Sequence, residues 1–204
     1  MHRIAVLIAA AALSGAALAE DPVACTSAPP KSIALVICKS PMLNALDAEL
    51  NRLYALATGP AGGASVPAVR SQQAPWLAAR AACMKSKTRV ACARDLTLAR
   101  IDAIRAQSMA ACSADAKGTS LGPFAFRCDT PDGMLSITYV NVKPGFAWIV
   151  RKGGASMLQQ QRSGSGARYE GDGTLFWEAQ GEARWRARTN DPEVACNRVQ
   201  GPGK

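Results

Sequence analysis

Residues 163–177 read Ser-Gly-Ser-Gly-Ala-Arg-Tyr-Glu-Gly-Asp-Gly-Thr-Leu-Phe-Trp, and this stretch indicates how the second half of the chain is built. Small, glycine-broken residues come first, and a Gly-Asp-Gly turn then leads into a strand-like run. Taken alone, such a Ser/Gly segment is typical of a surface hairpin loop. Its small residues would also let the backbone approach a partner closely, where two serine hydroxyls can donate and accept hydrogen bonds. The surrounding sequence decides between these two interpretations.

The region around this stretch has the pattern of a β-protein. Runs rich in β-formers alternate with turns of Gly, Pro and Asp, and they predict eight strands, at 124–129, 134–141, 146–152, 156–162, 167–170, 174–179, 182–188 and 194–199. Short, evenly spaced strands predict a small antiparallel barrel or sandwich. Eight is also the number of strands whose side chains just fill a closed barrel. We therefore expect a β-barrel domain over residues 121–204.

The first half of the chain is helical in pattern instead. Ser40 and Pro41 provide an N-cap and a proline at the first helical position, apolar residues then recur every three or four positions, and Gly59 ends the run. A short helical piece is predicted at 31–38, a second long helix at 68–84 with a kink or restart at Pro75, and a third at 91–108. The overall prediction is an α+β two-domain protein, with a small helical domain at 20–110 and a linker at 111–120.

An export signal precedes the helical domain. Arg3 is followed by an apolar run and by the small-residue cleavage site Ala17-Leu18-Ala19, which together predict a signal peptide over residues 1–19. The apolar run is too short to span a membrane well. Cys25 follows Pro-Val-Ala, which is a poor context for lipid attachment. We expect a soluble periplasmic or secreted protein without stable membrane insertion.

All seven cysteines lie after the signal peptide, at positions 25, 38, 83, 92, 112, 128 and 196. In an oxidising compartment most of them should be paired. Cys83 and Cys92 bracket the turn between the second and third long helices, and Cys128 and Cys196 lie in the first and last predicted strands. Cys25 and Cys38 form another local pair, although pairing across the helices stays open. Cys112, in the linker, is the expected odd thiol.

Several kinds of function are excluded or made improbable by composition. The single histidine, His2, leaves with the signal peptide, which removes Ser-His-Asp and Cys-His catalysis and histidine metal sites. We expect no metal and no cofactor. The net charge is +9, and +8 without Arg3. A basic exported protein can contact anionic polymers, but no dense Lys/Arg run with interleaved aromatics indicates nucleic acid.

Both halves resemble families of exported bacterial proteins. Residues 37–54 read Ile-Cys-Lys-Ser-Pro-Met-Leu-Asn-Ala-Leu-Asp-Ala-Glu-Leu-Asn-Arg-Leu-Tyr, and this segment resembles the LprI-type lysozyme-inhibitor domain. Gln73, Trp76-Leu77, Arg80 and Cys83 match the second helix of that family, and Cys92, Arg100-Ile101 and Ile104 match its third. The chain departs from the family pattern at Pro75 and at Thr97, where an aromatic residue is usual.

Residues 118–200 resemble the C-type lysozyme-inhibitor family, the MliC/PliC-like proteins. The resemblance is carried by 126–129, 137–139, 163–169, 175–177, 181–183 and Cys196. It implies an eight-stranded antiparallel barrel. It also implies that the loop at 163–169 enters the cleft of lysozyme, with the lysozyme-binding positions Ser163, Ser165, Gly166, Arg168, Tyr169 and Ala179.

The mechanism that this resemblance implies has a clear chemical basis. Lysozyme holds one active-site carboxylic acid protonated and one carboxylate ionised. A serine hydroxyl, here that of Ser165, can accept a hydrogen bond from the first and donate one to the second. In the family, a lysine two residues after the tryptophan joins the serine, but this chain has Ala179 there. Arg168 or Arg184 could provide the missing cation from another direction.

Three hypotheses of function follow. The first is an exported lysozyme inhibitor that blocks the cleft of a lysozyme, expected to be C-type, and so protects peptidoglycan without being an enzyme. The alternative is a binding module for wall or surface polymers that has no inhibitory activity; Ala179 and the basic charge favour it. The third is a glycosidase that would need paired carboxylates, for which the candidates are Glu170, Asp172, Glu178 and Glu182. The sequence leaves the oligomeric state and the target of the helical domain open.

Overall fold

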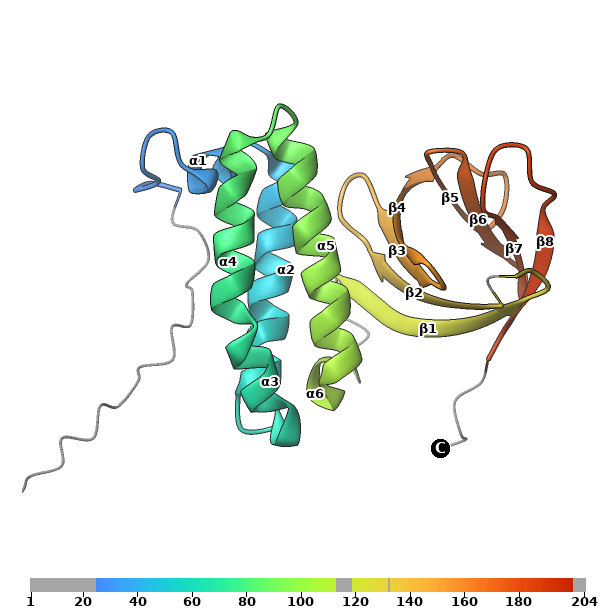
Figure 1. Ribbon diagram of the computed structural model, residues 1–204, viewed down its shortest axis with the longest axis horizontal. Helices are drawn as coiled ribbons and strands as arrows, with labels where there is room; N and C mark the ends of the chain where they lie inside the picture. The colour runs from blue at the N-terminus through green and yellow to red at the C-terminus, as the bar shows by residue number, and fades with distance from the viewer. Residues whose placement is uncertain (1–24, 113–118, 132, 200–204) are drawn as a thin grey trace, which may run out of the picture.

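The computed structural model describes residues 25–112, 119–131 and 133–199, and it contains a helical part followed by a β-barrel (Figure 1). The α+β two-domain arrangement predicted from the sequence is confirmed. The signal peptide expected at 1–19 and most of the expected linker, residues 113–118, lie outside the described residues.

The helical part contains three longer helices that lie side by side, with shorter turns at their ends (Figure 1). Its elements are α1(Ile33–Cys38), α2(Pro41–Thr58), η1(Gly63–Ser65), α3(Val66–Ser71), α4(Gln73–Ala82), η2(Cys83–Lys85), α5(Arg89–Gln107) and α6(Met109–Cys112). As predicted, Ser40 caps α2 by accepting a hydrogen bond from the Leu43 amide. The expected second long helix does restart, but the break lies at Gln72, so that the prediction of Pro75 as its position was wrong. Pro75 lies in the first turn of the restarted α4, where its missing N–H removes no helical hydrogen bond.

The eight strands form a closed antiparallel barrel in sequence order. They are β1(Ser120–Cys128), β2(Met134–Val140), β3(Phe146–Arg151), β4(Gly154–Gln161), β5(Ala167–Gly171), β6(Thr174–Ala179), β7(Glu182–Arg186) and β8(Val194–Arg198). β1 pairs with β8 through Phe126–Arg198 and Cys128–Cys196, and this pairing closes the barrel. β1 begins earlier than expected, because its pairing with β2 shifts between Leu121 and Phe124 and then continues.

Two apolar cores hold these parts together. One fills the barrel and includes the fully buried Phe126, Phe176 and Trp185. The other lies among the helices and extends onto the barrel through Val140, Val142 and Phe146. The core among the helices is therefore shared with the adjoining side of the barrel, while the core inside the barrel is separate from it.

Buried polar contacts also cross between the helices and the barrel. Arg105 of α5 is 1% exposed, and its guanidinium donates to the Gly122 carbonyl at 2.6 Å and to the Ser120 hydroxyl at 3.2 Å. Glu49 of α2 accepts from the Ser120 amide at 3.0 Å, and Asp102 of α5 accepts from the Thr138 hydroxyl at 2.6 Å. These contacts fix the barrel against α2 and α5.

The pKa values of two carboxyl groups at this contact, the buried Glu49 and the partly buried Asp102, are shifted in opposite directions. For Glu49, burial by itself raises the pKa, but hydrogen bonds from Arg52 and Ser120 outweigh burial, and the pKa lies below its usual value. For Asp102, burial raises the pKa, and the opposing hydrogen bond from Thr138 does not compensate. Glu49 is therefore the better stabilised anion of the two.

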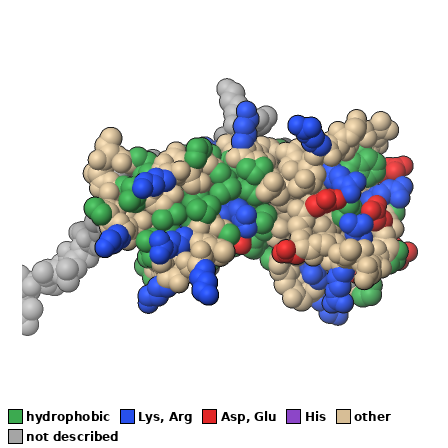
Figure 2. Space-filling model, turned by 90° about the horizontal axis from the view of Figure 1, so that it is seen from above, with side chains coloured by type: hydrophobic (Ala, Val, Ile, Leu, Met, Phe, Trp, Pro, Cys, Tyr) green, Lys and Arg blue, Asp and Glu red, His purple; other side chains and the backbone are tan. Residues whose placement is uncertain are grey.

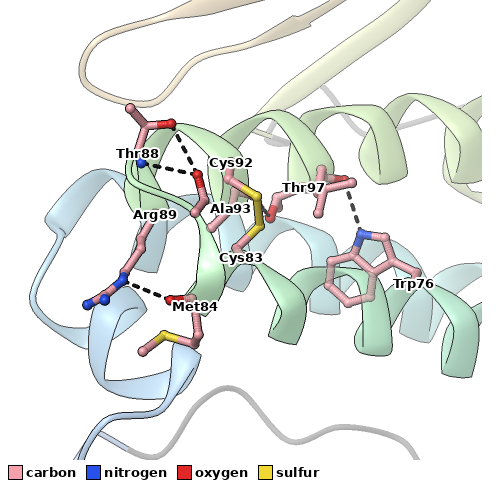
Figure 3. The surroundings of a disulfide bond; sticks show 10 residues. Trp76, Cys83, Met84, Thr88, Arg89, Cys92, Ala93 and Thr97 are labelled. Carbon is pink, nitrogen blue, oxygen red and sulfur yellow. Dashed lines mark hydrogen bonds between the residues drawn. A yellow bond between two sulfur atoms is a disulfide. The ribbon is translucent and has the colours of Figure 1, made fainter.

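Six of the seven cysteines form three disulfides, Cys25–Cys38, Cys83–Cys92 and Cys128–Cys196. The seventh, Cys112, is free and partly buried. Figure 3 shows the second of these disulfides, which joins Cys83 of η2, directly after α4, to Cys92 in the first turn of α5. Beside it, the Trp76 indole donates to the Leu96 carbonyl at 3.0 Å. Each helical disulfide closes a short loop, whereas Cys128–Cys196 joins the two strands that close the barrel.

Candidate functional site

The loop expected to carry the site lies at one end of the barrel. Because consecutive strands are antiparallel, the β2–β3, β4–β5 and β6–β7 connections share that end. Residues 162–166 form the β4–β5 connection, and Gln180 and Gly181 form the β6–β7 turn, where both have positive φ angles of 53° and 85°. The two segments are therefore neighbours at the same rim.

A tryptophan holds the loop in place. The Trp177 indole N–H donates to the Ser163 hydroxyl at 3.2 Å and to the Ser165 carbonyl at 3.1 Å, and the Ser163 hydroxyl donates to that same carbonyl. The side chain of Ser165 is exposed, and its hydroxyl makes no hydrogen bond within the described residues. The loop thus has a fixed backbone and one free hydroxyl at its tip.

Gly166 lets the loop lie directly against β6. Its φ is +64°, and a Cβ built on it would lie 2.5 Å from the Ala179 Cβ and in collision with the Glu178 carbonyl. Ala179 is only 6% exposed because the loop covers it. The position where the family has lysine is therefore adjacent to the loop, but here it is filled by a methyl group in contact with the backbone.

Two arginines flank Trp177 on the outer surface of the barrel. Arg168, Trp177 and Arg184 are directly paired across β5, β6 and β7. Arg168 is held by an ion pair with Glu170, whereas Arg184 lies 4.0 Å from Glu182 and its side chain is 50% exposed. These side chains line a shallow cavity of about 390 Å³ that also contacts Leu175 and Glu193. Arg184 is the cation with the weaker internal partner.

The inner side of the same strands supports the loop from within. Tyr169 is 3% exposed, and its ring lies 5.4 Å from that of Tyr139, whose hydroxyl donates to a Glu178 carboxylate oxygen at 2.7 Å. Burial and the nearby Glu178 raise the pKa of both tyrosines. Tyr169 therefore lies in the barrel core, so that any contribution to binding would act through the position of the loop.

The four acids considered for glycoside hydrolysis do not face one another across a cleft. Glu178 lies inside the barrel with Tyr139, and Glu170 lies on the outside with Arg168. Asp172 lies in the β5–β6 turn at the other end, and of the four only Glu182 lines the outer cavity. The arrangement therefore lacks the two carboxyl groups that flank a glycosidic bond in such enzymes.

Sequence reasoning identified the loop, but it did not identify what holds the loop. The two hydrogen bonds that Trp177 donates to the loop were not predicted. The sequence pattern could have shown part of this arrangement, because alternation along two paired strands places Trp177 and its partner Arg168 on the same face. Among the residues described, no group of three or more His, Cys, Asp or Glu side chains is placed to hold a metal ion.

Comparison with known proteins supports the two resemblances. Residues 126–194 match the family model described as membrane-bound lysozyme-inhibitor of c-type lysozyme. The chain is 29% identical over 196 residues to Lipoprotein LprI of Mycobacterium bovis, an alignment that covers 90% of this chain and 93% of the relative. Lipoprotein LprI of Mycobacterium tuberculosis matches equally well, and no solved structure matches.

The family-model match lies within the segment where the second resemblance was predicted, whereas the similarity to LprI extends beyond the helical half and covers 90% of the chain. Within the described ranges, no helix has the length and apolar character needed to cross a membrane. The matched segment contains the loop, Trp177 and the β6–β7 turn, which are the parts that form the candidate site. Residues 126–194 thus match the MliC lysozyme-inhibitor family, and nearly the whole chain is similar to Lipoprotein LprI.

Proposed function

We propose that this protein inhibits a C-type lysozyme by inserting residues 163–169 into the active-site cleft of the enzyme. The family match and the similarity to LprI support a lysozyme-inhibitor function. The observation that carries the proposed mechanism is the free Ser165 hydroxyl at the tip of a loop whose backbone Trp177 holds. A prearranged loop loses little conformational entropy on binding, which favours affinity.

The chemistry of the two partners is complementary. In the cleft, the Ser165 hydroxyl would accept a hydrogen bond from the protonated carboxylic acid and donate one to the ionised carboxylate. Both bonds would form in a site from which the loop excludes water, where hydrogen bonds to charged groups are strongest. The inhibitor would act stoichiometrically, as a binder and not as an enzyme.

Arg184 supplies the cation that position 179 lacks. Glu182 is the direct cross-strand partner of Ala179, so that Arg184, two residues further along β7, is its diagonal neighbour on the same face. Diagonal neighbours lie about 7–8 Å apart, which is within reach of a long side chain. The Arg184 guanidinium can therefore approach the carboxylate that lysine contacts in the family.

Substitutions at these two positions should change inhibition in opposite directions. Arg184→Ala should raise the inhibition constant for a C-type lysozyme about tenfold, the effect of losing one charge-assisted hydrogen bond. Ala179→Lys should lower it by a similar factor, whereas Ala179→Met adds comparable length without charge and should not. Arg127→Ala removes an exposed charge from β1 and serves as the matched control.

The site of binding is tested separately from its strength. A chitin oligosaccharide that fills the lysozyme cleft should compete with the protein, because both would occupy the same space. Binding that is unaffected by the oligosaccharide, or equal inhibition by Arg184→Ala and the parent protein, would contradict the proposed geometry.

The alternative function is a binding module for anionic envelope polymers. The row formed by Arg168, Trp177 and Arg184 favours it, since it combines two cations and an aromatic ring on one exposed face. Figure 2 shows Lys and Arg side chains over both parts of the molecule, which agrees with the net charge of +9. C-type lysozymes are generally basic, so this charge gives no long-range attraction to them. Binding to purified cell-wall polymer in the absence of lysozyme would distinguish this function from inhibition.

The protein is proposed to act outside the cytoplasm as a soluble inhibitor. Its similarity to a protein named a lipoprotein raises the question of a lipid anchor on Cys25. In the structure, Cys25 is bonded to Cys38, and the thiol that would carry a lipid is therefore occupied. Mass spectrometry of the exported protein should find Cys25 in a disulfide and without a lipid.

A further inference from the structure

A second cavity lies at the end of the barrel opposite the loop. It has a volume of about 370 Å³ and is lined by residues from the β1–β2 connection, from β3, β7 and β8, and from the β7–β8 connection. The β1–β2 and β7–β8 connections meet at this end, whereas residues 162–166 lie at the other. A cavity of this size is in the range of small-molecule sites. It belongs to no part of the proposed inhibitory surface.

The lining of this cavity includes two polar groups that have no partner. Trp185 is 0% exposed, and its indole N–H makes no hydrogen bond to any described residue. The Thr130 hydroxyl is also buried and has no partner within the same ranges. A buried donor without an acceptor costs about 1–3 kcal/mol, so native proteins rarely leave one unless a ligand or a water satisfies it. Both groups are donors of residues that line the same cavity, and a small acceptor such as a carboxylate is the kind of group that satisfies them.

Charged side chains of both signs line the same cavity. Arg151 and Arg188 are its positive residues, and Asp129 and Asp191 are its negative residues. Asp129, Asp191 and Arg188 are exposed, and none of the three forms an ion pair within the described residues. A simple anion would be repelled by the aspartates, and a simple cation by the arginines. A ligand that carries both charges complements the unpaired Arg188 and the two aspartates.

We propose that this cavity binds a small zwitterionic ligand, an α-amino acid or a short peptide with free ends. The ligand carboxylate accepts hydrogen bonds from the Trp185 indole and the Thr130 hydroxyl and lies near Arg151. The ligand ammonium group lies toward Asp129 and Asp191 at the rim. This inference is independent of lysozyme inhibition, because it uses none of the residues at the loop end.

The indole N–H signals of the four tryptophans make a direct test possible. The mature protein would be labelled with ¹⁵N and titrated with alanine and with alanylalanine. The Trp185 indole signal should move downfield with a dissociation constant near or below about 1 mM, while the signals of Trp76, Trp148 and Trp177 stay in place. N-acetylalanine, which lacks the ammonium group, and alaninamide, which lacks the carboxylate, should bind at least tenfold more weakly.

Variants that leave the barrel core intact sharpen the test. Thr130→Val and Asp191→Asn should each weaken binding at least tenfold and leave inhibition of lysozyme unchanged. Trp185→Phe serves only to assign the indole signal, because Trp185 is part of the core. No movement of the Trp185 signal with either probe, an equal response to alaninamide or to glucose, or unchanged binding by Asp191→Asn would each overturn the proposal.

Discussion

Replacing Gly166 by alanine should weaken inhibition of lysozyme about 100-fold, more than any other single change in the loop. The φ of +64° is unfavourable for a residue with a Cβ, and the new methyl group would collide with the Glu178 carbonyl and the Ala179 side chain. Left-handed backbone and steric overlap together cost about 3 kcal/mol, which corresponds to that factor if the loop must return to its present shape to bind. The loop would move off β6 to avoid the collision.

Gly164 provides a matched control two residues away. A Cβ built on Gly164 meets no atom within 4 Å, and its backbone is not left-handed. Gly164→Ala should therefore inhibit within about twofold of the parent protein. The measurement is the inhibition constant of both variants, with thermal unfolding to show that the barrel remains folded. Equal inhibition by Gly166→Ala and Gly164→Ala would show that the shape of the loop does not matter.

Replacing Arg105 by methionine should lower the free energy of unfolding by about 3 kcal/mol, since a buried hydrogen-bonded charge is lost and its acceptors remain. The Gly122 and Cys112 carbonyls and the Ser120 hydroxyl would lose the guanidinium that now contacts them. For a chain of this size such a loss lowers the melting temperature by roughly 6–12 °C.

The comparison for Arg105 is Arg70, which lies exposed on α3 and donates one hydrogen bond to the Thr58 carbonyl. Arg70→Met should change stability by less than about 0.5 kcal/mol. Urea unfolding followed by both far-UV circular dichroism and tryptophan fluorescence measures the two variants. If Arg105→Met unfolds at the same urea concentration as Arg70→Met, the hydrogen bonds of Arg105 to the barrel contribute nothing to stability.

Local signals in the sequence predicted most of the fold. Ser40 and Pro41 predicted the start of α2, and the Asp172-Gly173 pair predicted the turn before β6. Both signals depend only on residues close in the sequence. The break at Gln72 was missed because no glycine or proline marks it, and Pro75 drew attention to a position three residues later. The start of β1 was missed because Gly122 and Pro123 are typical of a turn, whereas the strand continues through them with a register shift.

Only those parts of the candidate site that lie in the motif shared with the C-type lysozyme-inhibitor family could be predicted. The loop and the missing lysine at 179 follow from the aligned motif, but the support from Trp177 depends on a contact between strands that no local pattern shows. Arg105 illustrates the same limit, because an arginine within a helix is usually solvated and this one is buried by a barrel that begins 15 residues later. The unpartnered Trp185 indole likewise depends on the three-dimensional arrangement.

Inhibition is best measured by titrating a C-type lysozyme with the purified mature protein during lysis of bacterial cell walls. We expect lysis to fall in proportion to added protein, to stop near equal molar amounts, and to be restored in large part when Ser165→Ala replaces the parent protein. Full lysis at a large molar excess of the parent protein, or equal inhibition by Ser165→Ala, would contradict this expectation.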